Sequence, residues 1–221
     1  MNDSQRSIAV LGGTGHEGSG IALRAALAGW KVVIGSRDSA RAAAKAEELN
    51  ALAGSRNVTG TGLLEAAQQA EMVVLAVPYS AQVSTAELVR PALEGKVLID
   101  VTVPLKPPKV SVVQLPAEGS CTVALQRRLG AGVRVVSAFQ NVSAHALMDK
   151  TNPVDCDVLV CADDPEAKAA TKELIQQMGL VAIDAGSLAN SVVAEALTSV
   201  LIHLNKTYKV PAAGIRITGL R

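Results

Sequence analysis

Two short segments near the start of the chain carry residue types and spacings that can bind a phosphorylated ligand. The first, GGTGHEG, follows the apolar run at residues 8–11 and contains the spacing G-x-G-x-x-G. In a strand–turn–helix unit, the backbone N–H groups of such a turn and the helix N-terminus can hold a pyrophosphate. We expect Gly13 to form the tight turn, Gly15 to let the phosphates approach the backbone, and Gly18 to let the helix pack on the strand. Thr14 adds a hydroxyl that can donate to a phosphate.

The second segment, GSR, ends the next apolar run and carries no carboxylate at the point where an NAD-binding protein holds the ribose 2′-hydroxyl. Ser36 offers a hydroxyl and Arg37 a planar bidentate donor, which are the groups that a 2′-phosphate needs. Arg41 lies one helical turn further along. Asp38 could bind a ribose hydroxyl, but its place before an Ala-rich run favours an N-cap, a role open to Ser39 as well. The two segments together predict an NADP(H) site.

The elements that must position these residues alternate along the first half of the chain. Strand-like apolar runs are separated by helical segments and short turns, which predicts a doubly wound, mostly parallel sheet of the Rossmann type. The carboxyl ends of such strands share one edge, where ligands bind. We therefore expect Val77 and Pro78, at the end of one run, and residues 100–104, at the end of another, to line the same cleft as the glycine turn. The expected strands are residues 8–11, 31–35, 58–60, 72–77 and 96–101.

The pattern changes after a further expected strand at residues 133–138. We place a Rossmann domain at residues 1–138 and a small C-terminal α/β domain at residues 139–221, which closes the cleft. Small residues, Ser137, Ala138 and Asn141 with residues 185–187, are expected to leave an apolar space beside the ligand. The last helix has a broad apolar face and predicts a homodimer surface. The remaining expectations are an irregular excursion at 106–118, helices at 122–129, 165–178 and 190–204, and strands at 157–162 and 180–184.

Composition narrows the classes of partner and location. The 221 residues carry a formal net charge of +1, with 19% charged and 2% aromatic residues, so neither a basic field nor stacking rings indicate nucleic acid. The polar start MNDSQRS and the short apolar runs predict a cytoplasmic protein without a membrane anchor. Cys121, Cys156 and Cys161 have no metal-ligand spacing and read as buried small residues in a reducing compartment. We expect small-molecule cofactors and no metal.

Several longer segments resemble one family. They are GGTGHEG, GSR with Arg41, LAVPYSA, VVSAFQNVSA, CADDPEAK, DAGSLANSVVAEALT and the C-terminal GIRITGL. In this register nearly the whole chain is similar to the NADPH:coenzyme F420 oxidoreductases and, more distantly, to the reductase domain of the STEAP metalloreductases. The resemblance implies a Rossmann domain, a small C-terminal domain, a homodimer, and a deazaflavin bound opposite the nicotinamide.

The resemblance also implies roles for particular residues. Thr14, Ser36, Arg37 and Arg41 fall on the family's NADP-binding positions. Val77, Pro78, Ala138, Gln140 and Asn141 fall in the segments that form its nicotinamide and deazaflavin walls. Archaeal members have Leu-His and Ile-Pro where this chain has Phe139-Gln140 and Val142-Ser143, so the acceptor, F420 or a flavin, stays open.

The expected reaction is hydride transfer between NADP(H) and coenzyme F420. Such a reaction needs two cofactors held at reacting distance in a dry cleft, and we expect no catalytic side chain. The chain has three histidines and no nucleophile elbow, which disfavours hydrolysis or acyl transfer. The alternatives are an NADPH-dependent flavin, imine or carbonyl reductase, and a non-catalytic NADP-responsive binding protein.

Overall fold

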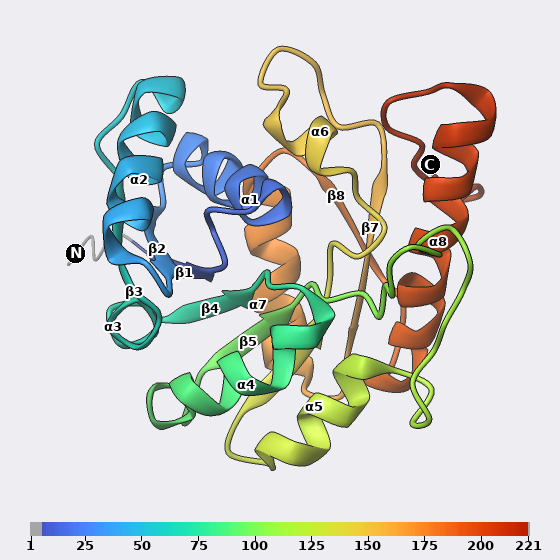
Figure 1. Cartoon of the computed structure of the whole chain (residues 1–221), viewed down its shortest axis with the longest axis horizontal. Helices are drawn as coiled ribbons and strands as arrows, with labels where there is room; N and C mark the ends of the chain where they lie inside the picture. The colour runs from blue at the N-terminus through green and yellow to red at the C-terminus, as the bar shows by residue number, and fades with distance from the viewer. Residues whose placement is uncertain (1–5, 221) are drawn as a thin grey trace.

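The computed structural model describes residues 6–220, which form one eight-stranded sheet covered by helices (Figure 1). The strand order is β3-β2-β1-β4-β5-β6-β7-β8, and all neighbouring strands are parallel except β6 and β7. The order of the strands therefore reverses between β1 and β4, as a doubly wound sheet requires. The strands are β1 (Ser7–Leu11), β2 (Lys31–Ser36), β3 (Val58–Gly62), β4 (Met72–Leu75), β5 (Val97–Asp100), β6 (Arg134–Ser137), β7 (Asp157–Ala162) and β8 (Val181–Asp184).

Helices cover both faces of this sheet. The α-helices are α1 (His16–Leu27), α2 (Ser39–Ala53), α3 (Leu63–Gln68), α4 (Tyr79–Val89), α5 (Cys121–Leu129), α6 (Ala144–Met148), α7 (Pro165–Gln177) and α8 (Ser191–Tyr208), with short 3-10 turns at Arg90–Ala92 and Leu188–Asn190. The predicted Rossmann-type fold is confirmed.

Alternation along β1 divides the core into two layers. Ile8 and Val10 belong to the buried cluster formed with α1, α2 and α7, whereas Ala9 and Leu11 belong to the cluster formed with α3, α4 and α5. All four side chains are fully buried. Side chains alternate between the two faces of a strand, so a strand buried on both sides is apolar throughout.

The predicted elements differ from the observed ones mainly at their carboxyl ends. β4 ends at Leu75 and β5 at Asp100, because the residues that follow turn into the loops at the edge of the sheet. The last helix continues to Tyr208, four residues beyond the expected end. The stretch at residues 106–118 is free of helix and strand, as expected. The short helices α3 and α6 were not singled out, since six and five residues are too few for a clear helical pattern.

The C-terminal part of the chain continues the sheet and shares the core of the first part. β7 pairs with β6, and Trp30 donates its indole N–H to Gln177 Oε1 on α7 at 2.8 Å. Leu174 and Ile175 of α7 lie in the same buried cluster as Ile8. A division into domains at residue 138 stays a prediction.

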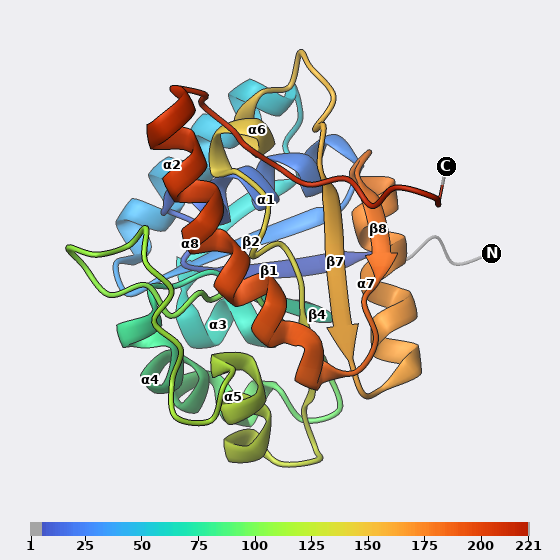
Figure 2. The same cartoon turned by 90° about the vertical axis from the view of Figure 1, so that its right-hand side faces the viewer.

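Two remaining features bear on the sequence predictions. The run Leu188–Tyr208 has the length and mean hydropathy, 1.2, of a membrane span by composition alone, and 33% of its apolar window is buried. In the structure α8 packs beside β7 and α5 (Figure 2). Most of the polar start MNDSQRS, residues 1–5, lies outside the described residues.

Candidate functional site

A cavity of about 940 Å³ lies beyond the carboxyl ends of β1, β4, β5 and β6, at the point where the strand order reverses. Its volume is at the upper end of the range for small-molecule sites, and its lining is mostly apolar. The lining consists of residues 15–17, 76–80, 101–103 and 105–107 with Val110, Phe139, Gln140, Val142 and Thr198. Of the predicted site residues, the cavity brings together Gly15, Val77, Pro78 and Gln140.

The glycine turn joins β1 to α1 and needs glycine for two different reasons. Gly12 has a φ of +84°, and a Cβ there would collide with the carbonyl oxygen of Ala76. At Gly18 a Cβ would lie 2.6 Å from the Gly12 oxygen. This close approach agrees with the packing role expected of Gly18, which stays a prediction. Both Gly12 and Gly13 lie in the turn, where the Gly13 N–H donates to the Val10 carbonyl at 3.1 Å, but the positive φ is at Gly12 and not at Gly13. Gly13 instead packs on β2, where a Cβ would lie 2.9 Å from Ile34 Cγ2.

Gly15 differs from its neighbours because space remains at its α-carbon. A Cβ there would meet only the Gly12 oxygen, at 3.3 Å. Gly15 is the N-cap of α1 and has no side chain to cap the helix, so the first N–H groups of α1 remain available to an anion. The turn is thus suited to a pyrophosphate. Thr14 lies half-exposed within it, outside the lining of the cavity.

The predicted 2′-phosphate donors lie at the tip of β2, beside the turn and outside the cavity. The N–H of Gly12 donates to the Gly35 carbonyl at 2.9 Å, which ties the turn to β2. Arg37 and Arg41 are exposed, and among residues 6–220 neither guanidinium forms an ion pair. Asp38 caps α2 by accepting the N–H of Arg41 at 3.0 Å, so the N-cap interpretation is confirmed. Both arginines are therefore free to meet a ligand.

Unpaired buried polar atoms concentrate at the cavity. Among the described residues, five buried side-chain oxygens lack a hydrogen-bond partner, and three of them belong to residues that line the cavity. These three are Glu17 Oε1, Thr102 Oγ1 and Gln140 Oε1. Leaving such atoms unpaired costs about 1–3 kcal/mol each, so their clustering indicates a site that a polar ligand completes.

The wall opposite the glycine turn follows β6. Phe139 has a φ of +74° although it is bulky and fully buried, so its backbone is strained. Two hydrogen bonds fix Gln140. Its side-chain Nε2 donates to the main-chain carbonyl of Asp100 at 2.7 Å, and its main-chain carbonyl accepts the Thr198 hydroxyl at 2.6 Å. Its free Oε1 is thereby held beside the cavity by contacts from β5 and α8.

Below this wall a buried polar network joins β5 to three helices. Asp100 accepts hydrogen bonds from Gln82 Nε2 at 2.5 Å, the Thr102 N–H at 3.0 Å and the Thr122 hydroxyl at 3.2 Å. Burial raises the pKa of Asp100 to about 6, and Glu195 adds to the rise. Glu195 of α8 in turn accepts from the Ser120 hydroxyl and from the N–H groups of Cys121 and Thr122 at the start of α5. The region beneath the cavity is therefore held together by contacts between residues that lie far apart in the sequence.

Two predicted site residues lie below the wall instead of at the cavity. Ala138 is fully buried in the core. The Asn141 side chain is also buried, and its Nδ2 donates to the Asp157 carbonyl at 2.7 Å while its Oδ1 accepts the Leu159 N–H at 3.3 Å. Neither residue belongs to the lining. In the described structure Asn141 links the wall to β7.

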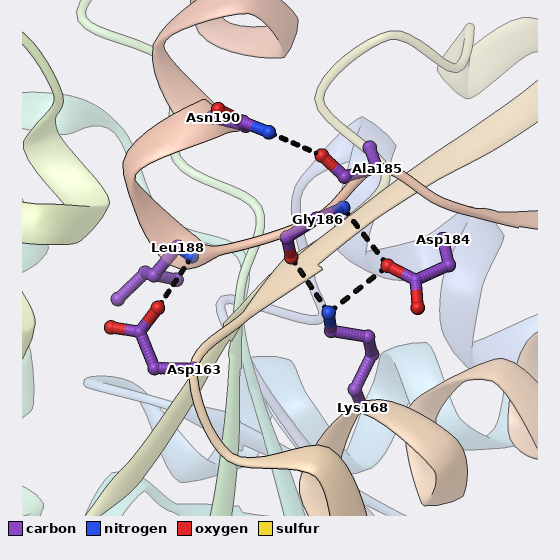
Figure 3. Close-up of polar contacts among 7 residues, drawn as sticks. All are labelled: Asp163, Lys168, Asp184, Ala185, Gly186, Leu188 and Asn190. Atoms are coloured by element: carbon purple, nitrogen blue, oxygen red, sulfur yellow. Dashed lines mark hydrogen bonds and ion pairs between the residues drawn. The ribbon is translucent and has the colours of Figure 1, made fainter.

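The expectation that residues 185–187 leave space beside the ligand is wrong. Because β7 runs antiparallel to β6, the carboxyl ends of β7 and β8 lie away from the cavity edge. There Lys168 Nζ contacts Asp184 Oδ1 at 3.0 Å and the Gly186 carbonyl at 2.7 Å, and Asp163 accepts the Leu188 N–H (Figure 3). Asn190 closes the turn by donating to the Ala185 carbonyl. These contacts fix the start of α8, and α8 then brings Thr198 back to the cavity.

Sequence reasoning missed Glu17 and Thr198, whereas Thr102 lies in the strand-end segment 100–104 that it places at this edge. Glu17 occupies the third variable position of the glycine motif and is the second residue of α1. A carboxylate beside a predicted pyrophosphate site was a usable signal, because two like charges in one turn repel each other. Thr198 carries no such signal. The three cysteines are free and buried, and among the described residues no group of three or more His, Cys, Asp and Glu could hold a metal ion.

Comparison with known proteins agrees with this geometry. The family described as NADP oxidoreductase coenzyme F420-dependent matches residues 7–104. The F420-dependent NADP reductase of Methanothermobacter marburgensis is 45% identical, over 96% of this chain and 98% of the relative. The chain belongs to the F420-dependent NADP reductase family. The reductase of the same name from Methanocaldococcus jannaschii is 42% identical, over 96% of this chain and 98% of that one.

More distant relatives extend the family likeness. Rat metalloreductase STEAP3 is 31% identical over 90% of this chain, which corresponds to 37% of STEAP3. A solved structure from Arthrobacter sp. FB24, assigned as an F420-dependent NADP reductase, superposes with a TM-score of 0.79 at 27% identity, over 96% of this chain and 98% of that one. An imine reductase from Bacillus cereus, at 18% identity and a TM-score of 0.62 over 93% of this chain and 63% of its own, shares the fold.

Proposed function

We propose that this member of the F420-dependent NADP reductase family transfers hydride between NADP(H) and the deazaflavin coenzyme F420. Three curated relatives with that name are 42–45% identical over nearly the whole chain. The structural observation that carries the proposal is one continuous cavity, lined by the glycine turn on one side and by Phe139, Gln140 and Val142 on the other. A reaction between two ring cofactors needs such a shared space.

The residues present fit the nucleotide. The open position at Gly15 and the uncapped start of α1 suit the pyrophosphate, and the unpaired Glu17, Thr102 and Gln140 oxygens suit a polar ring entering the cavity. We assign the 2′-phosphate to Ser36, Arg37 and Arg41, with Thr14 as a further donor to the phosphates. Val77 and Pro78 line the cavity, and we assign them to its nicotinamide end. Ala138 and Asn141 do not line the cavity, and we assign them a supporting role beneath the residues of its wall.

When bound, the two cofactors would supply the chemistry, which is transfer of a hydride between the nicotinamide and deazaflavin rings. The protein holds the rings in an apolar space and keeps water away. Gln140 presents its Oε1 from a fixed amide, because its Nε2 is held by the Asp100 carbonyl. The surrounding core holds the buried Phe139 in its strained backbone conformation and so sets the course of the wall.

The direct test mixes the protein with NADPH and oxidised F420 and follows the deazaflavin absorbance. We expect NADPH-dependent bleaching, with FMN and FAD reduced far more slowly. Binding of NADPH without bleaching of F420 would refute F420 as the acceptor. Faster reduction of a flavin would establish the flavin reductase alternative. Reduction of an imine or a ketone would establish the imine or carbonyl reductase alternative. Absence of turnover with every acceptor would favour the NADP-responsive binding protein.

We also propose a homodimer formed through α8. Val193, Val200 and Tyr208 are 59%, 44% and 69% exposed on this helix. Apolar side chains aligned on one exposed helix face are typical of subunit contacts. Sedimentation should give twice the chain mass, and Val193→Asp should give the monomer with an unchanged NADPH affinity. A wild-type monomer at micromolar concentration would contradict the dimer. A cytoplasmic location stays a prediction.

A further inference from the structure

Glu17 places a carboxyl group where the free protein gives it no partner. It is the second residue of α1 and lines the cavity beside Gly15 and His16. The residue is half-buried, but its Oε1 is shielded from solvent and receives no hydrogen bond from the described residues. A buried carboxylate without donors is costly, whereas a neutral carboxyl keeps a donor of its own. Burial raises the pKa of Glu17 to about 8.

The charged and titratable groups around Glu17 influence whether its carboxyl group is neutral or ionised when a ligand binds. His16 from the same turn, Tyr79 from α4 and Lys106 from the excursion are the other titratable or charged residues in the lining of the cavity. On the opposite side α6 packs against α1 and carries His145, while Arg24 of α1 donates to the α6 carbonyls at Ala146 and Leu147. None of these is a carboxylic acid, and the carboxylate of Asp149, which follows α6, accepts hydrogen bonds from Thr151 and Asn152. Glu17 is therefore the one carboxyl group among the described residues that line the cavity.

The same turn must also receive the pyrophosphate of a dinucleotide. The N–H groups at the start of α1 favour one anion there, and an ionised Glu17 would compete with the phosphates and repel them. A neutral Glu17 removes that repulsion and leaves an O–H that can donate to a polar atom in the cavity. Binding of the dinucleotide should therefore select the protonated side chain.

We propose that Glu17 positions the nicotinamide riboside half of NADP(H) as a neutral carboxylic acid that donates a hydrogen bond to it. The identity of the ligand rests on the proposed function, while the role of Glu17 rests on its burial, its unpaired oxygen and its place in the turn. In this role Glu17 is a positioning residue that binds one proton in the complex and releases it at high pH.

The test measures binding of NADP⁺ by calorimetry from pH 6.5 to 9.5, without F420, in buffers of two different ionisation enthalpies. For the wild type we expect the Kd to rise by up to about tenfold per pH unit above pH 8, with uptake of a fraction of a proton on binding. Glu17→Gln, which keeps a donor and cannot ionise, should hold a constant Kd within about threefold of the wild-type value at pH 7. Glu17→Leu should also be pH-independent, with a Kd about 5–30-fold higher.

A truncated ligand tests which half of the nucleotide is contacted. 2′,5′-ADP lacks the nicotinamide riboside, so the Gln and Leu variants should bind it equally. The proposal is overturned by a flat wild-type Kd without proton uptake, by a Gln variant that keeps the wild-type pH dependence, or by a Leu variant that binds NADP⁺ as tightly as the Gln variant. The wild-type measurement needs no variant to fold. Failure of F420 reduction with these binding results intact would refute only the proposed acceptor.

Discussion

The two walls of the cavity are built in opposite ways. The nucleotide wall is local: residues 12–18 form it in one strand–turn–helix unit, and its ligand-facing groups are largely backbone N–H groups. The opposite wall, to which the proposed function assigns the acceptor and which is called the acceptor wall below, is assembled from distant segments, with Asp100, Gln140 and Thr198 joined by buried hydrogen bonds. Substitutions on the first wall should therefore change binding with little change in stability, unless they touch the turn backbone. Substitutions on the second should change both.

The largest expected effect separates fold from binding within the nucleotide wall. Gly12→Ala puts a side chain at a φ of +84° and against the Ala76 carbonyl, so we expect the free energy of unfolding to fall by about 3–5 kcal/mol. Gly15→Ala is the matched control, because its Cβ would meet only one oxygen at 3.3 Å. It should unfold at nearly the wild-type urea concentration and lose affinity for NADPH. Equal destabilisation by both variants would show that Gly15 is needed for the fold.

The next effect concerns the acceptor wall and its dependence on pH. Because the folded pKa of Asp100, about 6, lies above its ordinary value of 3.8, its protonation stabilises the protein at low pH. That stabilisation is complete below about pH 4 and is lost as pH rises through 6. Relative to Asp100→Asn, the wild type should lose up to about 3 kcal/mol of unfolding free energy between pH 4 and 7. Urea titrations at several pH values measure this.

The exposed Glu71→Gln, at the start of β4, serves as the control for this titration. Its stability profile should follow the wild type throughout. Parallel profiles for Asp100→Asn and the wild type would mean that Asp100 keeps an ordinary pKa in its buried network.

The third effect tests whether the nucleotide wall acts on binding alone. Arg37→Ala should weaken NADPH binding by about 1–3 kcal/mol through loss of a charge-assisted contact, and leave NADH unchanged. Arg41→Ala is the neighbouring control and should cost less. Melting temperature should stay constant in both, since the two side chains are exposed and form no ion pair in the described structure. Equal losses for NADH and NADPH would remove Arg37 from the 2′-phosphate site.

The smallest effect tests whether Asp38, the N-cap of α2, also contacts the ribose. As the N-cap of α2 it accepts the Arg41 N–H, so Asp38→Ala should lower the free energy of unfolding by about 1 kcal/mol. The Kd for NADPH should change by less than about threefold. A larger change in Kd without a change in stability would instead place Asp38 on the ribose.

The sequence predicts the residues of the nucleotide wall and its neighbouring strand ends better than those of the acceptor wall. Gly15, Val77 and Pro78 were found because they follow apolar strands, and parallel strands bring their carboxyl ends to one edge. Ala138 and Asn141 were placed at the cavity from their position after β6, yet both are buried below it. The strained turn at Phe139 decides which side chains face the cavity, and the sequence does not reveal a positive φ at a phenylalanine.

The sequence by itself determined the Rossmann-type order of strands, the glycine turn, the arginines at the tip of β2 and the family. These depend on periodicity and on contacts within a few residues, which a linear pattern records. Only the tertiary structure decided that the positive φ of the turn is at Gly12, that residues 185–187 lie away from the cavity, and that Glu17 is left without a partner. Strand direction, backbone strain and burial arise from contacts between segments far apart in the chain, so they exist only once the sheet has formed.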